Sequence, residues 1–402
     1  MIGRRQLPVA SPISPTALLR ALRSATADAE SLAKSAEDLV CRQFDARAAV
    51  LTDSGTSALV LALRLAVRAG GVVAFPGYAC VDLTAAARYA GVRVRLYDLD
   101  PSTLSPDLAS LRRTFDERVD AVVVAHLFGY PADVSGVRAL ATERGITVIE
   151  DAAQGAGGLL DGSRLGSLGD LSISSFGRGK GLCAGGGGAL LASNDRWAAA
   201  ITESCLPAGG RGLAGLAKVG VQWALGRPSV YAIPSMIPWL RLGQMVYHPA
   251  SEPTSMALAA NALLPSAFAL EPADLEMRRK HARAFDAVIS HVEELLVVHP
   301  IIGATPGYLR YAVRDPTRRA ADAKLGIARP YPVTMSEQSE LAPMLEPKQS
   351  PTPGATELRE TLVTLPTHRF VDRRDFEALW RWMTAGKIAP FPEVGLSFAR
   401  GR

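Results

Sequence analysis

A regular alternation of short apolar runs and helical segments, from about residue 48 to residue 175, constrains the fold of this chain more than any other feature. The predicted strands are AAVLT (48–52), GVVAF (71–75) and VRVRLYDL (92–99), followed by AVVVAHL, ITVIE and LSISS. The segments between these runs have helical spacing. Strands that alternate with longer helices are typical of βαβ units and of a mostly parallel sheet with helices on both faces. We therefore expect an α/β fold whose ligands lie at the carboxyl ends of the strands.

The alternation fades beyond about residue 195, which indicates a second unit. Residues 253–296 have helical spacing, residues 307–314 resemble a strand, and a Pro- and Ser-rich loop precedes a last helix near the end. A chain of 402 residues is also longer than one small core requires. We expect a large α/β domain over residues 1–245 and a smaller C-terminal α+β domain over residues 246–402.

The charge distribution gives no indication of a nucleic-acid partner. The chain has 44 Lys and Arg and 39 Asp and Glu, and its formal net charge is +5. The two signs are interspersed without a block of like charge, so the basic balance is interpreted as a preference for arginine.

Cysteine spacing and hydropathy indicate the cellular setting. Cys41, Cys80, Cys183 and Cys205 form no CxxC pair and have no histidine cluster beside them, so we expect neither disulfides nor a metal site, and a cytoplasmic location. The N-terminus has no apolar core of the kind a signal peptide requires. The most apolar region, residues 223–249, is interrupted by prolines and is too short to cross a bilayer. We expect it to pack over an active site or a subunit interface rather than to contact a membrane.

One lysine stands inside a glycine-rich stretch, SSFGRGKGLCAGGGG (174–188). Only seven of the 44 basic residues of the chain are lysines. A lysine is needed in place of an arginine where the amine must at times be neutral, because a guanidinium does not deprotonate in proteins. Lys180 is therefore a candidate for Schiff-base chemistry, which needs a lowered amine pKa. Arg178 can supply the neighbouring positive charge or can point to solvent.

The loop TDSGTSAL (52–59) joins a predicted strand to a predicted helix. Gly55 permits close approach of the backbone, and Thr56 and Ser57 offer hydroxyl and N–H groups at the start of the helix. This is a phosphate-binding arrangement. A helix cap without a ligand is the alternative.

Two further loops complete a possible constellation. The strand ITVIE delivers Asp151 to its carboxyl end, with Gln154 just beyond, and Ser175 ends the strand before Lys180. A carboxylate in this position either caps the next helix or holds a cationic ring nitrogen, as the pyridinium of pyridoxal phosphate requires. Together the loops offer a phosphate cradle, a partner for a ring nitrogen and an imine-forming amine.

These stretches resemble a known family. The segments SGTSAL, PGYAC, DLDPSTLSPD, HLFGYPAD, VIEDAAQGAGG and GSLGDLSISSF, with the Lys180–Gly188 run, are similar to the DegT-type sugar aminotransferases. These are pyridoxal 5′-phosphate enzymes of fold type I. The resemblance is dense over residues 48–192 and thinner beyond.

By position, the resemblance implies a role for each matching residue. Lys180 would bond the cofactor covalently and move the proton during transamination, Asp151 would hold the pyridinium nitrogen, and Gln154 would lie near the ring oxygen. The phosphate would be held by Gly55, Thr56, Ser57 and Ser175. Relatives with a histidine in place of the lysine dehydrate sugars, so Lys180 favours transamination.

The chain also departs from the family pattern. Where the family places an aromatic residue that stacks on the cofactor ring, this chain has Cys80, and Tyr78 lies two residues earlier. Either Tyr78 reaches the ring or a smaller group covers it. His126 either reaches the site or bonds a loop backbone. The tyrosine- and arginine-rich loop by which relatives reach the neighbouring subunit is replaced by residues 223–249.

The resemblance implies an aminotransferase that transfers an amino group from L-glutamate to a keto-sugar, nucleotide-linked, for polysaccharide or glycoconjugate biosynthesis. It further implies a homodimer, because active sites in the family are completed across the subunit interface. Two alternatives stay open: a pyridoxal-phosphate enzyme that acts on a non-sugar carbonyl, and a non-catalytic regulatory homologue.

Overall fold

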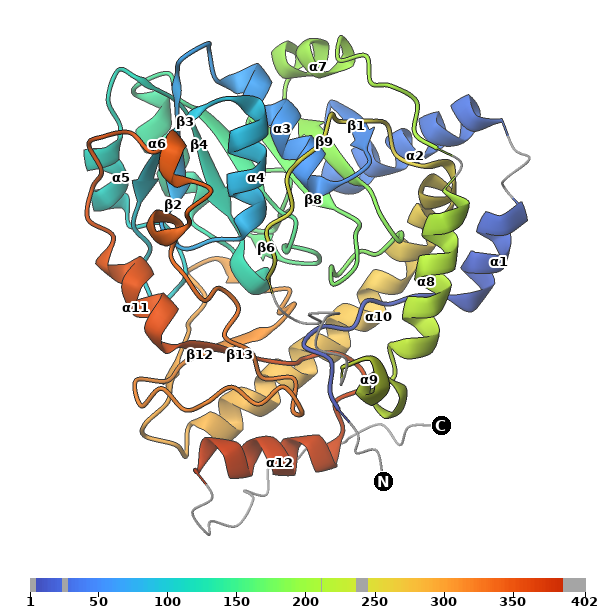
Figure 1. Cartoon of the computed structure of the whole chain (residues 1–402), viewed down its shortest axis with the longest axis vertical. Helices are drawn as coiled ribbons and strands as arrows, with labels where there is room; N and C mark the ends of the chain where they lie inside the picture. Colours follow the sequence, from blue (N-terminus) through green and yellow to red (C-terminus); the bar gives the residue numbers. More distant parts are fainter. Residues whose placement is uncertain (1–4, 24–27, 211, 236–244, 386–402) are drawn as a thin grey trace.

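The computed structural model describes residues 5–23, 28–210, 212–235 and 245–385 of the chain (Figure 1). Its centre is a seven-stranded sheet with the order β1-β9-β8-β5-β4-β2-β3. The strands are β1 (Ala48–Thr52), β2 (Val72–Pro76), β3 (Arg93–Tyr97), β4 (Val119–Ala125), β5 (Thr147–Asp151), β8 (Leu171–Ser175) and β9 (Gly188–Ala192).

The sheet is mostly parallel, as the alternating pattern predicted. Strands β3, β2, β4, β5 and β8 pair in parallel, whereas β9 runs antiparallel to both of its neighbours, β8 and β1. Strand β2 is buried along its whole length, and β4 is buried except at Asp120, which is why they are nearly continuous apolar runs rather than alternating ones.

Helices cover both faces of the sheet, and alternate residues of one strand show this directly. In β4, Val122 and Val124 belong to one hydrophobic core, while Ala121 and Val123 belong to the other. The first core includes residues of α5 (Leu108–Thr114) and α6 (Val134–Thr142). The second includes residues of α3 (Gly55–Ala66), α4 (Val81–Ala90) and α7 (Asp195–Thr202).

The N-terminal helical segment differs from its prediction. The spacing predicted one helix over residues 18–44, but the chain forms α1 (Pro15–Arg23) and α2 (Ala29–Phe44), with residues 24–27 outside the described part. The break has a local cause. Asp28 has extended backbone angles and its side chain accepts from the Glu30 N–H, so it starts a new helix as an N-cap.

The long helix α10 (Leu258–Ile289) joins the large sheet to the C-terminal part of the chain. Leu263 and Phe268 pack in the core beneath α2, whereas Phe285 and Val288 pack in the core of a small antiparallel sheet. That sheet has the order β10-β12-β13 and is formed by β10 (Leu296–Val297), β12 (Tyr311–Arg314) and β13 (Leu362–Leu365). Helices α11 (Pro353–Thr361) and α12 (Arg373–Met383) flank β13 in sequence. The division between residues 245 and 246 stays a prediction.

A second small sheet connects the two parts of the chain. It has the order β11-β6-β7 and is formed by β6 (Leu159–Leu160), β7 (Ser163–Arg164) and β11 (Ala304–Thr305). Because β6 lies between β5 and β8 in the sequence and β11 lies beyond α10, their pairing fixes the loop after β5 against the C-terminal part.

The apolar region 223–249 is only partly described. Helix α8 (Leu213–Leu225) reaches into it, α9 (Pro228–Ser235) follows, and residues 236–244 lie outside the described part. Among the helices of the described residues, none has the length and apolar character needed to cross a membrane. Trp223 packs against a small core of Ile13, Cys183 and Val219, and Cys183 belongs to the glycine-rich lysine loop.

Candidate active site

Three of the predicted loops meet at one edge of the central sheet. Strand β5 ends at Asp151, and the neighbouring parallel strand β8 ends at Ser175. Helix α3 begins at Gly55, directly against the end of β8. Carboxyl ends of parallel strands share one edge of a sheet, so the order of the strands brings these loops together.

The contact between Gly55 and Ser175 forms the floor of a candidate phosphate cradle. A Cβ atom at Gly55 would lie 2.8 Å from the Ser175 Cβ, so only glycine permits this approach. Ser54 caps α3 by accepting from the Ser57 N–H at 3.1 Å. Within the described part of the chain, the hydroxyls of Thr56 and Ser175 have no hydrogen-bond partner. Unpaired hydroxyls at a helix N-terminus suit an anion.

Asp151 lies at the point where β5 ends, and Oδ1 accepts from the Ala153 N–H at 3.0 Å. Burial raises the pKa of the Asp151 carboxyl, although the Ala153 N–H and the Lys180 ammonium oppose this change. The carboxylate therefore lies where a further positive charge would stabilise its ionised form.

Lys180 lies in the glycine-rich loop after β8. Its side chain is half-buried, and among the described residues it has no hydrogen-bond or ion-pair partner. Its ammonium acts electrostatically on Asp151 and on the Cys80 thiol. Arg178 is exposed and acts on Tyr231 of α9, so it lies on the α9 side of the loop.

The lysine loop packs closely against its neighbours. A Cβ atom at Gly181 would lie 2.7 Å from the Ala156 Cβ and 2.8 Å from the guanidinium nitrogens of Arg278. Arg278 is buried on α10, where it pairs with Asp274 and reaches the Gly181 carbonyl at 3.5 Å. The residue after the lysine is therefore fixed between the loop following β5 and the long helix.

Gln154 connects this edge of the sheet to a distant loop. Its Oε1 accepts from the Phe128 N–H at 3.0 Å, and its Nε2 donates to the Tyr331 hydroxyl at 2.9 Å. The Tyr331 ring lies 5.0 Å from the Tyr78 ring and 5.4 Å from the Phe128 ring. Tyr331 is buried, and its phenol interacts electrostatically with Cys80 and Asp151.

Sequence reasoning missed Tyr331. It lies in the Pro- and Ser-rich stretch that the sequence predicted as a loop, where no periodic pattern marks buried residues. The only available signal is an aromatic residue between two prolines, which a turn would explain equally well. Its burial against Tyr78 and Gln154 makes it part of the site.

The two candidates for covering the cofactor ring, Tyr78 and Cys80, differ in their surroundings. Tyr78 is only 1% exposed, and the Tyr331 backbone hydrogen-bonds its hydroxyl, which fixes it within the aromatic cluster. The Cys80 Sγ lies 3.3 Å from Asp82 Oδ2, and burial raises the pKa of this thiol. The Lys180 ammonium acts electrostatically on the Cys80 thiol and opposes this rise.

His126 has a structural role in this arrangement. Its Nε2 lies 2.8 Å from Glu150 Oε1, both side chains are fully buried, and its Nδ1 accepts from the Ala132 N–H. Glu150 accepts further hydrogen bonds from the backbone of Gly166, Leu168 and Gly169 and from the Ser172 hydroxyl. Of the two interpretations offered by the sequence, the loop-bonding histidine is the one that this geometry supports.

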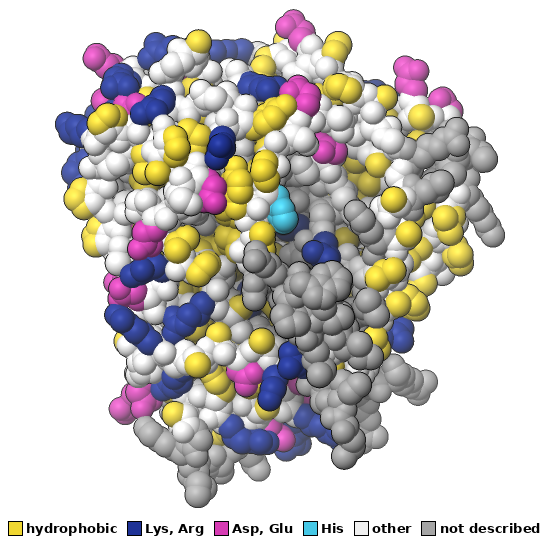
Figure 2. Space-filling view, viewed as in Figure 1, with side chains coloured by type: hydrophobic (Ala, Val, Ile, Leu, Met, Phe, Trp, Pro, Cys, Tyr) yellow, Lys and Arg dark blue, Asp and Glu magenta, His cyan; other side chains and the backbone are white. Residues whose placement is uncertain are grey.

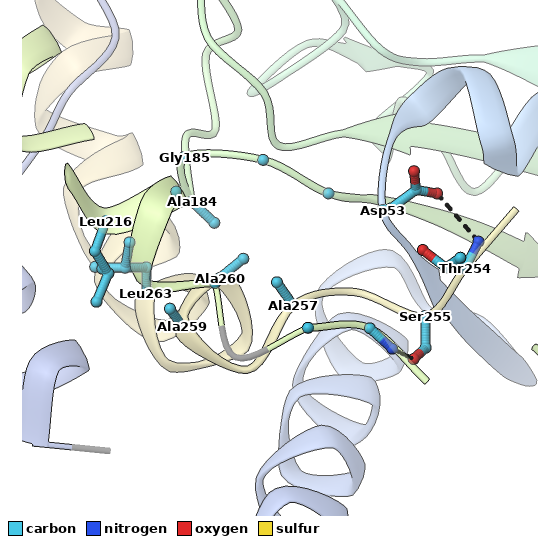
Figure 3. A pocket seen from close by; sticks show the side chains of 16 residues that line it. Asp53, Ala184, Gly185, Leu216, Thr254, Ser255, Ala257, Ala259, Ala260 and Leu263 are labelled. Atoms are coloured by element: carbon cyan, nitrogen blue, oxygen red, sulfur yellow. Dashed lines mark hydrogen bonds between the residues drawn. The ribbon is translucent and has the colours of Figure 1, made fainter. Parts of the chain in front are cut away.

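A small cavity of about 130 Å³ borders the glycine run (Figure 3). Gly185–Gly187 line one side, Ala257, Ala259 and Ala260 line the other, and Asp53 lies at one end, hydrogen-bonded to the Thr254 N–H. Neither Lys180 nor Asp151 lines this cavity. Within the described residues there is also no group of three or more His, Cys, Asp or Glu side chains that could hold a metal ion.

Comparisons with known proteins agree with this architecture. The profile of the DegT/DnrJ/EryC1/StrS aminotransferase family matches residues 16–214. The chain is 36% identical over 143 residues to a UDP-N-acetyl-3-dehydro-alpha-D-glucosamine 3-aminotransferase of Acidithiobacillus ferrooxidans, covering 35% of this chain and 39% of that protein. It therefore aligns with well under half of that relative.

Two other comparisons extend over most of the chain. A UDP-2-acetamido-2-deoxy-3-oxo-D-glucuronate aminotransferase of Pseudomonas aeruginosa is 26% identical over 357 residues, which are 87% of this chain and 89% of that protein. The crystal structure of the aminotransferase TlmJ from Streptoalloteichus hindustanus superposes with a TM-score of 0.74 at 24% identity and covers 96% of this chain and 99% of that one. The chain has the fold type I architecture, and its residues 16–214 match the DegT/DnrJ/EryC1/StrS aminotransferase family.

Proposed function

We propose that this protein is a pyridoxal-phosphate-dependent aminotransferase that moves an amino group from L-glutamate to a keto-sugar, most simply a nucleotide-linked one. The observation that carries the proposal is the placement of Lys180. Its amine has no hydrogen-bond or ion-pair partner in the described structure, and it acts electrostatically on the Asp151 carboxylate from the loop that follows the neighbouring parallel strand.

The residues present fit pyridoxal phosphate. The Gly55 backbone and the hydroxyls of Thr56, Ser57 and Ser175 would hold its phosphate, and Asp151 would hold its ring nitrogen. Gln154 would bind the ring oxygen. Its amide nitrogen carries two N–H groups and gives one to Tyr331, so the other stays available. When bound, the cofactor supplies an electron sink for the substrate carbanion.

The chain's own groups would perform the remaining steps. Lys180 Nζ would bond the cofactor covalently. Once a substrate has displaced it, the free amine would accept the proton from the substrate α-carbon and pass it to the cofactor. Asp151 would keep the ring nitrogen positively charged, which favours loss of that proton. The buried aromatic cluster around Tyr331 would exclude water from one side of the site.

The names of two relatives support a sugar acceptor, since both are aminotransferases of UDP-linked keto-sugars. The product would then be an amino sugar for a polysaccharide or glycoconjugate. A non-sugar carbonyl acceptor is the alternative within the same chemistry. A non-catalytic regulatory role is disfavoured, because such a protein would not need Lys180, Asp151 and Gln154 together.

We further infer a cytoplasmic homodimer. Leu19 and Leu22 of α1 and Val221 of α8 are between 51% and 60% exposed, which supports a subunit contact on this side of the molecule. In Figure 2, hydrophobic side chains gather over these two helices at the right of the view. The cysteines are free thiols, which supports a reducing compartment.

The visible spectrum of the purified protein with pyridoxal phosphate, before and after L-glutamate, tests the proposal. Wild type should show an absorbance band of the lysine-bound cofactor that glutamate removes, with release of 2-oxoglutarate. Lys180→Ala should lack the band, whereas Lys34→Ala, which changes an exposed lysine on α2, should keep it. A wild type that binds no cofactor would refute the catalytic function. Binding without a response to glutamate would refute only the donor.

A further inference from the structure

The N-terminal strap, residues 5–14, lies between the C-terminal part of the chain and the lysine loop (Figure 1). Its first contacts are backbone hydrogen bonds. The Arg5 N–H donates to the Pro228 carbonyl at 3.1 Å, and the Gln6 N–H donates to the Lys324 carbonyl at 2.8 Å. The strap then continues to α1, so it passes the edge of the sheet where the candidate site lies.

One end of the strap is fixed to the C-terminal part. Gln6 is only 1% exposed, and its Nε2 donates to Asp375 Oδ2 at 2.6 Å and to the Phe370 carbonyl at 2.9 Å. The His368 Nε2 donates to the Leu7 carbonyl at 2.8 Å. Buried side-chain hydrogen bonds of this kind hold a terminal segment that would otherwise fray.

The other end is fixed to the lysine loop. The Ser11 hydroxyl accepts from the Gly179 N–H at 3.1 Å, and it also hydrogen-bonds the buried Cys183 thiol. Ile13 packs against Cys183 and Val219. These contacts lie on both sides of Lys180 in the sequence.

The lysine loop needs contacts from other segments because its own residues do little to fix its conformation. Gly179 has a φ of +78°, which only glycine adopts at low cost, and glycines surround the lysine. Lys180 has no hydrogen-bond partner in the described part of the chain. The loop therefore takes its position from its neighbours, and Ser11 makes a direct hydrogen bond to the residue before the lysine.

We propose that the N-terminal strap positions Lys180, with Ser11 as the positioning residue, and that Gln6 links this position to the C-terminal part of the chain. The proposal rests on the proposed function only in treating Lys180 as the cofactor lysine. The strap itself can be tested without cofactor.

The first experiment uses cofactor-free, full-length protein. Limited trypsin digestion after Arg178 and Lys180, and alkylation of Cys183 by iodoacetamide, are followed by peptide mass mapping. Ser11→Ala should accelerate both by about fivefold, the effect of one lost hydrogen bond on local opening. Ser14→Ala is the matched control, because this hydroxyl bonds only Thr16 and Ala17 nearby. Equal rates in Ser11→Ala and wild type would overturn the proposal.

A second variant tests the link to the C-terminal part. Gln6→Met preserves length but removes the hydrogen bonds to Asp375 and Phe370, and it should also accelerate cleavage at Lys180 and alkylation of Cys183. If Ser11→Ala accelerates cleavage and alkylation but Gln6→Met does not, the contact of Ser11 with Gly179 still positions the loop, and the proposed link through Gln6 to the C-terminal part is overturned.

The third measurement uses cofactor-loaded protein. Ser11→Ala should shift the pH midpoint of the absorbance of the lysine-bound cofactor and lower kcat about fivefold, with KM for glutamate unchanged. A purely structural serine would change the unfolding midpoint without shifting the titration, which would contradict a positioning role. If wild type binds no cofactor, the proposed function fails, whereas the cofactor-free experiments still decide whether the strap holds the loop.

Discussion

Gln154 Nε2 donates a hydrogen bond of 2.9 Å to the hydroxyl of Tyr331, a residue 177 positions further along the chain. This single contact joins the loop after β5 to the C-terminal part of the molecule. It also fixes the orientation of an amide whose other N–H group is free to bind a ligand.

Tyr331→Phe should weaken this connection while preserving the ring contacts with Tyr78 and Phe128. Gln154 would lose a buried acceptor, so we expect a loss of about 1 kcal/mol in the free energy of unfolding and weaker cofactor binding. Urea denaturation and a pyridoxal phosphate titration measure the two effects. Tyr89→Phe is the control, because the Tyr89 hydroxyl bonds Glu252 at the surface. If both variants have the same stability and the same cofactor affinity, the Gln154–Tyr331 hydrogen bond contributes no more than a surface hydrogen bond.

Gly55→Ala should disrupt the candidate phosphate cradle. Its Cβ would lie 2.8 Å from the Ser175 Cβ, so α3 or β8 must move, at a cost of about 1–3 kcal/mol. We expect cofactor affinity to fall more than stability, as measured by parallel titration and denaturation. At Gly220 on α8 a Cβ meets nothing within 4 Å, so Gly220→Ala should leave affinity unchanged. Unchanged affinity in Gly55→Ala would place the phosphate elsewhere.

His126→Ala should destabilise the protein without a direct effect on chemistry. It removes the 2.8 Å contact to the fully buried Glu150 and leaves a cavity, so a loss of about 3 kcal/mol is expected. His291→Ala changes an exposed histidine and should cost little. Thermal denaturation compares the two, and full stability in His126→Ala would argue against a structural role.

Stability should fall on acidification because of His368. Burial lowers the pKa of His368 to about 4, below its usual 6.5. Between these two pH values His368 binds a proton in the unfolded chain but not in the folded chain. The free energy of unfolding therefore decreases as the pH falls from about 6.5 toward 4. Burial lowers the pKa of His281 too, in the same direction.

Denaturation at several pH values in this window, for wild type and His368→Gln, measures the contribution of His368. The glutamine can still donate to the Leu7 carbonyl, and it does not titrate. Its stability should therefore depend less on pH than that of wild type, and an identical dependence would assign the effect to other groups.

The sequence by itself determined the local elements and the ends of the strands. AAVLT forms β1 at residues 48–52 and β8 ends at Ser175, where the pattern placed them, and β5 ends at Asp151, one residue beyond the predicted run ITVIE. Apolar periodicity reports which residues face a core, and parallel strands deliver their following loops to one edge, so neighbouring loops meet there whatever the remaining structure. The cofactor roles of these residues stay predictions.

Only the tertiary structure decided what surrounds these loops. The pairing of antiparallel β9 between β1 and β8, the burial of Tyr331 against Tyr78, and the contact of Ser11 with Gly179 across 168 positions all join distant segments. Such contacts depend on how the whole chain packs, and an irregular loop or a terminal strap carries no periodic pattern that records its partners. Local sequence therefore specified the reactive groups, and long-range packing decided which side chains hold them in place.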